Sequence, residues 1–205
     1  MMRTMEGDPP VTQVYMPPRS AVMRLVDAGL VRGLDSPKLD ALRAECWDDD
    51  EDQMDEVGVL GILTMFYETV DKGVRDGFLW HDDRFWMETE DVVSELAAML
   101  RDDRPLFKQL EIEEQTAHGS QSRETLQKIL VERDDGARKE LLARGLDDVV
   151  ACFNEELRAR GRGKRIVSLD TSGEWKMYIA AELRLIRKLV ADGALPVTDL
   201  DSLRD

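Results

Sequence analysis

The sequence predicts an α+β protein dominated by helices, with about seven or eight helices and one or two short β-hairpins. Apolar residues recur at helical spacing over most of the chain, as in Val57, Leu60 and Leu63. β-branched and aromatic residues instead concentrate at 165–169 and 174–179, on either side of the turn-forming sequence DTSG. We therefore expect a helical framework with a hairpin near the C-terminus.

The 205 residues suffice for one good-sized domain or two small ones. Four prolines between residues 9 and 18 disfavour a regular helix and predict an extended or mobile arm over 1–18. The polar, glycine-containing segment 115–124 is typical of a linker or loop. It divides two expected parts: a helical half with a short β element, 19–114, and a helix-hairpin-helix half, 125–205. In the alternative, 19–205 forms one continuous domain.

Several residues are expected to begin or end helices. Ser20 and Ser36, the second followed by proline, have the side chain that accepts the free amide hydrogens of a first helical turn. Gly29, Gly145 and Gly193 each follow an apolar residue by four positions and precede another one. This spacing favours a left-handed glycine that ends a helix.

The remaining elements of the first half follow from periodicity. The segment 57–74 predicts a central helix, and 92–100 predicts a second amphipathic one. The sequence FLWHDDRFWM at 78–87 suits a tight β-hairpin or a single exposed turn. Residues 106–112 fit either a strand or a loop.

In the second half, helices are expected over about 122–133, 136–144 and 146–160, because apolar residues recur there at spacings of three and four. A final helix is expected over about 180–192, after the hairpin. Its basic residues face away from its apolar ones.

The chain is strongly acidic. It contains 43 acidic and 28 basic residues, a formal net charge of −15, while 42% hydrophobic residues argue against wholesale disorder. Such a charge disfavours nucleic acid and anionic membrane surfaces as direct partners, and it attracts basic proteins or cations. We therefore expect a basic protein partner.

Cysteine usage and hydropathy favour a cytoplasmic protein. Cys46 and Cys152 lie in apolar helical patterns without the spacing of a zinc or redox site, and we interpret both as small core residues. No apolar run reaches the roughly 20 residues of a membrane span. The N-terminal MMRTMEGDPP lacks the basic-then-apolar order of a secretory signal.

The acidic run at 48–56, in which seven of nine residues are acidic, is a candidate cation site or a solvated helix start. It does not match a calcium-binding loop. Counted from Asp48, Gln53 stands where the loop needs glycine and Val59 where it needs glutamate.

Part of this run also resembles a family of enzymes. Glu51-Asp52-x-x-Asp55 followed by Glu68-x-x-Asp71 resembles the EExxE…ExxD arrangement of all-helical nucleoside triphosphate pyrophosphatases of the MazG type, with aspartates in place of several glutamates. The resemblance is confined to residues 51–71. It implies that Asp52, Asp55, Glu68 and Asp71 hold magnesium for nucleotide hydrolysis.

The aromatic segment is the candidate partner-binding site. Exposed aromatic rings beside carboxylates can grip a basic partner, because the rings bury apolar area and the carboxylates steer the approach. The candidate residues are Trp80, Asp82, Asp83, Arg84 and Trp86. In the alternative interpretation, the two rings pack on the central helix.

A basic tract at 158–165 is a weaker candidate for anion binding, through Arg160, Arg162, Lys164 and Arg165. Alternatively, its basic residues complement the carboxyl end of a helix and its glycines end that helix. The two histidines, His81 and His118, lack the spacing of a metal site, and no hydrolase signature or phosphate-binding loop is present.

The functional hypothesis is therefore an acidic cytosolic protein-binding module of the inhibitor or immunity type, which masks a basic partner such as a nuclease toxin. No cofactor is expected. The alternatives are a magnesium-dependent nucleotide phosphohydrolase and an accessory subunit of a larger assembly. Magnesium belongs to the phosphohydrolase alternative alone.

Overall fold

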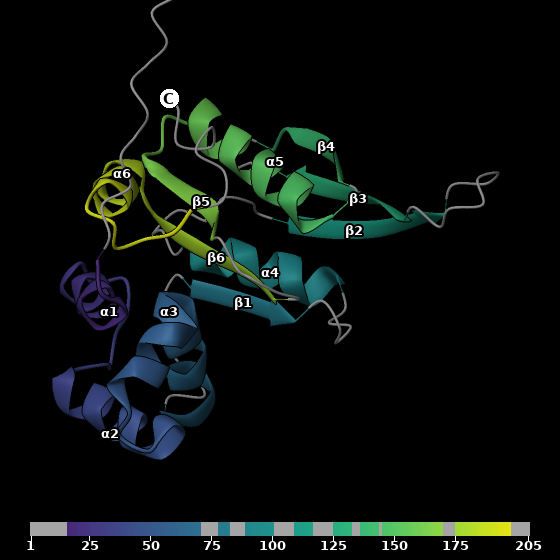
Figure 1. The fold of residues 1–205 in the computed structure, drawn as a ribbon. Helices are drawn as coiled ribbons and strands as arrows, with labels where there is room; N and C mark the ends of the chain where they lie inside the picture. The colour runs from purple at the N-terminus through teal and green to yellow at the C-terminus, as the bar shows by residue number, and fades with distance from the viewer. Residues whose placement is uncertain are drawn as a thin grey trace, which may run out of the picture.

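The computed structural model of this chain is an α+β structure in which helices surround one antiparallel sheet and separate it from a second (Figure 1). The structure describes residues 16–70, 78–82, 89–100, 109–116, 125–132, 136–143, 145–169 and 175–197. Helices predominate over strands, as the sequence predicts.

Six α-helices and one short π-helix occur among the described residues, slightly fewer than expected. They are α1 (Pro18–Asp27), α2 (Ser36–Trp47), α3 (Glu51–Met65), the π-helix η1 (Phe66–Val70), α4 (Thr89–Met99), α5 (Leu146–Ala159) and α6 (Leu183–Ala191). The central helix is α3 together with η1. It begins earlier than 57, and it contains a kink at Gly58, whose φ of 67° is left-handed.

The first sheet has the strand order β1-β6-β5, from β1 (Phe78–Asp82), β6 (Trp175–Glu182) and β5 (Lys164–Leu169). The antiparallel pair β5–β6 confirms the hairpin predicted near the C-terminus. The segment 78–82 does not pair within a local hairpin: Phe78 lies opposite Ile179 in β6. The second half of the predicted 78–87 element lies outside the described residues.

The second sheet replaces two predicted helices. Its order is β2-β3-β4, from β2 (Gln109–Thr116), β3 (Thr125–Glu132) and β4 (Arg138–Ala143). Ile129 and Val131 are buried at a spacing of two, as are Leu141 and Ala143. Short apolar runs fit helical and strand periods equally well, and cross-strand pairing decided for strands here.

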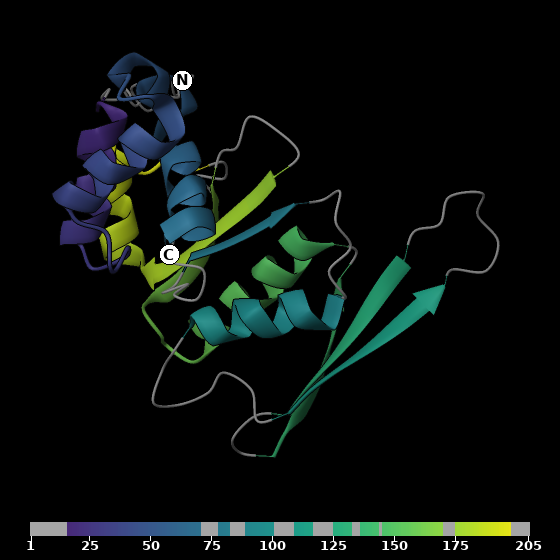
Figure 2. The same ribbon diagram turned by 90° about the horizontal axis from the view of Figure 1, so that it is seen from below.

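The first sheet is buried on both faces. Val167, Leu169 and Ile179 belong to a core with helices α1, α2, α3 and α6, whereas Ile166 and Tyr178 belong to a core with α4, α5, β3 and β4. Figure 2 shows the same layers, with α4 and α5 between the two sheets. Both strands of the C-terminal hairpin thus contribute to both cores.

The segment 117–124, predicted as the centre of a linker, lies outside the described residues. On either side of it, Thr116 of β2 pairs with Thr125 of β3. The predicted division of the chain into parts at this segment stays a prediction. None of the described helices has the length and apolarity of a membrane span.

Two of the predicted glycine-ended helices are confirmed. Gly29 and Gly193 have φ values of 72° and 75°, and the amides of Leu30 and Ala194 reach back to the carbonyls of Leu25 and Leu189. Gly145 instead adopts an extended conformation and stands at the N-cap of α5. Its backbone lies where β4 turns into a helix, not where a helix ends.

Both serine caps were placed wrongly. Helix α1 begins at Pro18, after Pro17 at its N-cap, so Ser20 lies inside the first turn. Proline suits the first helical position because the missing amide hydrogen has no partner there. Helix α2 is capped by Asp35, whose carboxylate accepts from the amide of Lys38, and Ser36 is its first residue.

Helix α6 begins at Leu183, not near 180, because Ala180, Ala181 and Glu182 belong to β6. Ala180 and Ala181 pair with Ile166 and Arg165 of β5. The ladder of the hairpin therefore extends further along the chain than its aromatic and β-branched residues.

Candidate functional site

The acidic run forms the corner between helices α2 and α3. Helix α2 ends at Trp47, and Asp48 and Asp49 follow with left-handed φ values of 50° and 65°. Aspartate is among the few residues that tolerate this conformation. The two aspartates turn the chain so that α3 begins within four residues of the end of α2.

Asp50 has a structural role in this corner. One carboxylate oxygen accepts from the amides of Asp52 and Gln53, at 2.9 Å and 3.2 Å, and the other accepts from the side-chain amide of Gln53 at 3.0 Å. These hydrogen bonds, above all the one from the backbone of Gln53, hold the pKa of Asp50 below its ordinary value. Asp50 is therefore the N-cap of α3.

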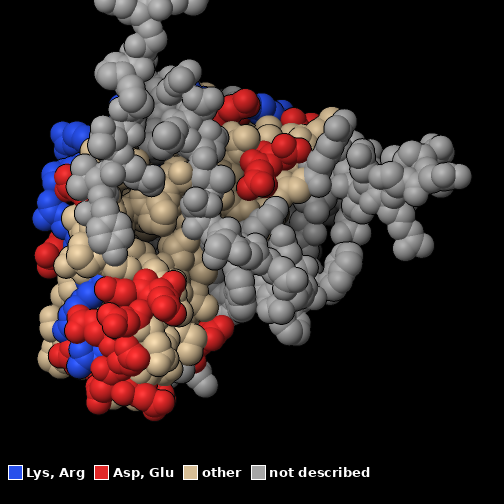
Figure 3. Space-filling view, in the orientation of Figure 1, with Lys and Arg blue, Asp and Glu red and all other residues tan. Residues whose placement is uncertain are grey.

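The other acidic side chains of the corner are exposed. We define the acidic corner as Asp48, Asp49, Glu51, Asp52 and Glu56. In Figure 3 acidic side chains gather over the position that α2 and α3 occupy in Figure 1. The next residue, Val57, is one of two large apolar residues with high exposure in the described part of the chain, at 43%.

Only part of this charge is compensated locally. Arg43 of α2 lies 3.6 Å from Asp49 and 3.5 Å from Glu51, measured between its nitrogens and their carboxylate oxygens. In the described part of the chain, Asp48, Asp52 and Glu56 take part in no ion pair. The corner therefore presents a net negative surface to solvent.

The basic tract is engaged elsewhere in the fold. The ammonium group of Lys164 donates to the carbonyl of Leu100 at 3.0 Å, and the guanidinium of Arg165 donates to the carbonyls of Arg162 and Lys164 at 2.6 Å and 2.7 Å. Arg165 is buried, and Arg162 is half-buried. The tract lies between α5 and β5, far from α2 and α3 in Figure 1.

One further residue of the tract meets a buried carboxylate. Arg160 lies 3.9 Å from Glu156, which is fully buried and also 2.7 Å from the ammonium group of Lys139. The positive charge of the tract is thus directed toward internal acceptors, and it does not neutralise the acidic corner. Anion binding by Arg160, Arg162, Lys164 and Arg165 stays a prediction.

The residues suggested by the pyrophosphatase resemblance do not converge in the described structure. Asp55 precedes the kink at Gly58 by three residues, and Glu68 follows it by ten, roughly 15 Å of helix. Asp71 lies outside the described residues. Where side chains are described, no three acidic, histidine or cysteine residues are placed to hold a metal ion.

The predicted partner-binding residues fall largely outside the described residues. Trp80 and Asp82 lie on β1, opposite Met177 and Trp175 in the strand register. Asp83, Arg84 and Trp86 are not described. Their role in binding stays a prediction, and so does the exposure of the two tryptophans.

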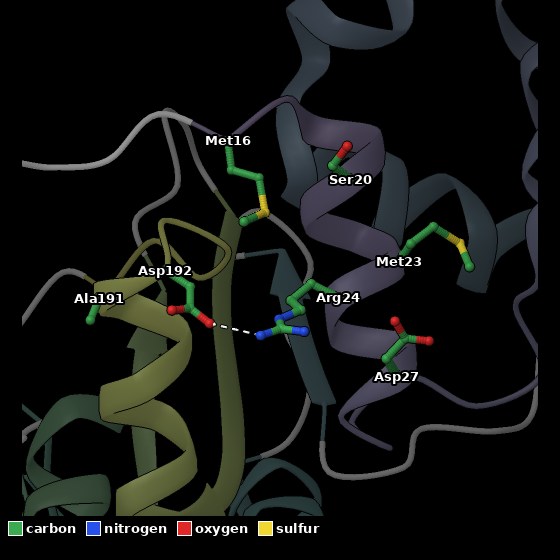
Figure 4. Close-up of a pocket in the computed structure, with 7 residues that line it drawn as sticks. All are labelled: Met16, Ser20, Met23, Arg24, Asp27, Ala191 and Asp192. Atoms are coloured by element: carbon green, nitrogen blue, oxygen red, sulfur yellow. Dashed lines mark hydrogen bonds and ion pairs between the residues drawn. The ribbon is translucent and has the colours of Figure 1, made fainter.

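A groove between α1 and the end of α6 is a feature that sequence reasoning missed. It has a volume of about 620 Å³ and is lined by Met16, Ser20, Met23, Arg24, Asp27, Ala191 and Asp192 (Figure 4). Ser20, Arg24 and Asp27 are spaced by four and three residues, which places them on one side of a helix. No local signal links that side of α1 to residue 192.

The two thiols are packed against the two cores. Cys46 and Cys152 are half-buried, each against a different cluster of apolar side chains. Burial raises the pKa of both thiols, and neighbouring Glu45 and Glu155 raise them further. Both cysteines are therefore protonated at neutral pH and poor nucleophiles, as expected for core residues.

Comparison with protein-family models, with curated proteins and with solved structures finds no match to this chain. The function is therefore inferred from the chemistry of the acidic corner and the groove themselves.

Proposed function

We propose that this chain is a protein-binding module whose acidic corner engages a basic surface on a partner protein. The observation that carries the proposal is the uncompensated charge of that corner. Arg43 pairs with Asp49 and Glu51, whereas Asp48, Asp52 and Glu56 are exposed and have no ion pair within the described residues.

The corner has the electrostatic properties that such a contact needs. Exposed carboxylates of one sign accelerate the approach of an oppositely charged surface, and their effect weakens as salt is added. They are placed on a rigid support, because Asp50 fixes the start of α3 and Arg43 ties α2 to it. A preorganised site loses less conformational entropy on binding.

Affinity also needs apolar contact. Val57, directly after Glu56, offers one exposed apolar side chain at the edge of the corner. The predicted aromatic anchors, Trp80 and Trp86, would add to it, since aromatic residues often dominate binding energy at interfaces.

The proposed module is an inhibitor or immunity-type protein in the cytoplasm. Its carboxylates would stand in for the phosphates that a nuclease toxin binds, and so mask the basic cleft of that enzyme. The surplus of acidic over basic residues in the whole chain supports attraction to such a cleft.

The test begins with the full-length chain immobilised and exposed to extract of its native host at moderate salt, and to a panel of purified basic nucleases. Recovery of a basic protein whose binding weakens as salt increases supports the proposal. Failure to recover such a partner from either source would end it.

Two matched double variants then locate the contact. Asp48→Asn with Glu56→Gln removes two charges from the acidic corner and leaves the Asp50 cap intact, and asparagine tolerates the left-handed backbone at position 48. Glu140→Gln with Glu155→Gln removes two charges from β4 and α5. The first variant is expected to weaken binding at least threefold more than the second. Equal effects would show that only the total charge matters.

A further inference from the structure

The groove between α1 and α6 combines apolar walls with a fixed polar side. Met16, Met23 and Ala191 supply its apolar lining, and Met16 and Met23 are also half-buried against the neighbouring core. In Figure 4 the side chain of Met16 points into the gap between the two helices. A volume of about 620 Å³ lies within the range of sites that hold small ligands or short peptide segments.

An ion-pair network closes the groove between the helices. The guanidinium of Arg24 donates to Asp192 across the gap at 3.1 Å, and Lys188 donates to the same carboxylate at 2.9 Å (Figure 4). These two donors, Lys188 first, lower the pKa of Asp192. Arg24 and Asp192 are therefore already paired and contribute little unbalanced charge to a ligand.

Asp27 is the remaining charged side chain of the lining. It is exposed at the carboxyl end of α1, and within the described residues it has no ion pair or hydrogen-bond partner. A carboxylate in this position near the negative end of the α1 dipole favours a cationic ligand group. The groove thus offers a flexible apolar lining beside one uncompensated negative charge.

We propose that this groove binds a short segment of a partner protein in which an apolar side chain is followed by a basic one. The apolar side chain lies among Met16, Met23 and Ala191, and the basic group pairs with Asp27. Methionine adapts its shape to different apolar groups, so the lining accepts leucine, isoleucine or methionine. The inference does not depend on the acidic corner, whose residues belong to other helices.

The direct test uses the full-length, ¹⁵N-labelled chain and a pair of capped dipeptides. Acetyl-Leu-Arg-amide carries the proposed chemistry, and acetyl-Leu-Glu-amide differs only in the charge of its second residue. The arginyl peptide is expected to shift amide resonances of α1 and of residues 191–193, and to bind at least threefold more tightly than the glutamyl peptide. Equal affinity for the two peptides, or no shift localised to the groove, would overturn the proposal.

Three variants identify the contacts. Asp27→Asn is expected to reduce affinity for the arginyl peptide about threefold, as loss of one exposed ion pair should, and to leave the glutamyl peptide unweakened. Glu155→Gln on α5 is the charge-matched control and should leave both affinities unchanged. Met23→Ala is expected to weaken both peptides, because it removes apolar lining. An unchanged affinity in Asp27→Asn would contradict the assigned role of Asp27.

A truncated chain distinguishes this occupant from the chain's own N-terminus, which begins next to Met16. If the arginyl peptide bound only after removal of residues 1–15, this segment would be the occupant, and an external partner would be excluded. Similar affinities of the full and truncated chains support the external partner.

Discussion

The side chain of Asn154 makes both of the hydrogen bonds that a neighbouring strand would make with Ile166. Its amide nitrogen donates to the carbonyl of Ile166 at 2.7 Å, and its carbonyl oxygen accepts from the amide of Ile166 at 2.9 Å. Ile166 lies on β5, an edge strand of the first sheet. Helix α5 thereby satisfies an edge that would otherwise hold unpaired backbone groups.

Asn154→Ala should destabilise the protein by about 3 kcal/mol, because it leaves a buried donor and a buried acceptor of Ile166 without partners. The free energy of unfolding in urea measures this. The neighbouring substitution Glu155→Gln, at an exposed position, should change it by no more than about 0.5 kcal/mol. A loss below about 1 kcal/mol in Asn154→Ala would mean that the pair has little structural weight.

Gly61→Ala should also destabilise the protein, although alanine is the better helix former by about 1 kcal/mol. A Cβ atom on Gly61 would lie 2.7 Å from the Cβ atom of Val57, across the kink at Gly58. In a Val57→Gly background that contact is absent, and the same substitution should become neutral or stabilising. Thermal or urea unfolding of the four proteins tests this reversal of sign.

The stabilising contribution of Asp50 should depend on pH. Hydrogen bonds from Gln53 lower the pKa of Asp50 in the folded state, so folding favours its ionised form. The resulting stability is complete above the unfolded-state pKa, near 4, and disappears as pH falls through the lower folded value. Asp50→Ala should therefore be less stable than the wild type at pH 7, with a smaller difference at pH 3. A difference that grew on acidification would contradict this assignment.

The sequence predicted most reliably what depends on neighbouring residues. Gly29 and Gly193 were identified as helix ends because the Leu25–Leu30 and Leu189–Ala194 contacts that define them are local. The β5–β6 hairpin was identified for the same reason. The pairing of β1 with β6 joins residues from opposite ends of the chain, and no local pattern encodes it.

The same distinction explains the second sheet and the site. Residues 125–132 and 138–143 contain apolar spacings that fit a helix, and only the pairing of β3 with β2 and β4 makes them strands. The acidic run was visible in the sequence, but its single basic neighbour, Arg43, was not. The Arg24–Asp192 ion pair across the groove is likewise a contact between distant segments.

Arg43→Gln should make the acidic corner a stronger attractor, because Asp49 and Glu51 lose their basic neighbour. We expect faster association with a basic partner at low salt, and a loss of stability below about 1 kcal/mol, as for exposed ion pairs. Stopped-flow association kinetics and urea unfolding measure the two effects. Slower association in a fully folded Arg43→Gln variant would indicate that Arg43 itself contacts the partner.

The most direct test of the proposed function is the salt dependence of association between the recovered basic partner and the chain. For the wild type, the association rate should fall steeply with ionic strength. For Asp48→Asn with Glu56→Gln, it should be lower at low salt and fall less steeply. A rate that is independent of salt, or identical in the two proteins at every salt concentration, would contradict binding through the acidic corner.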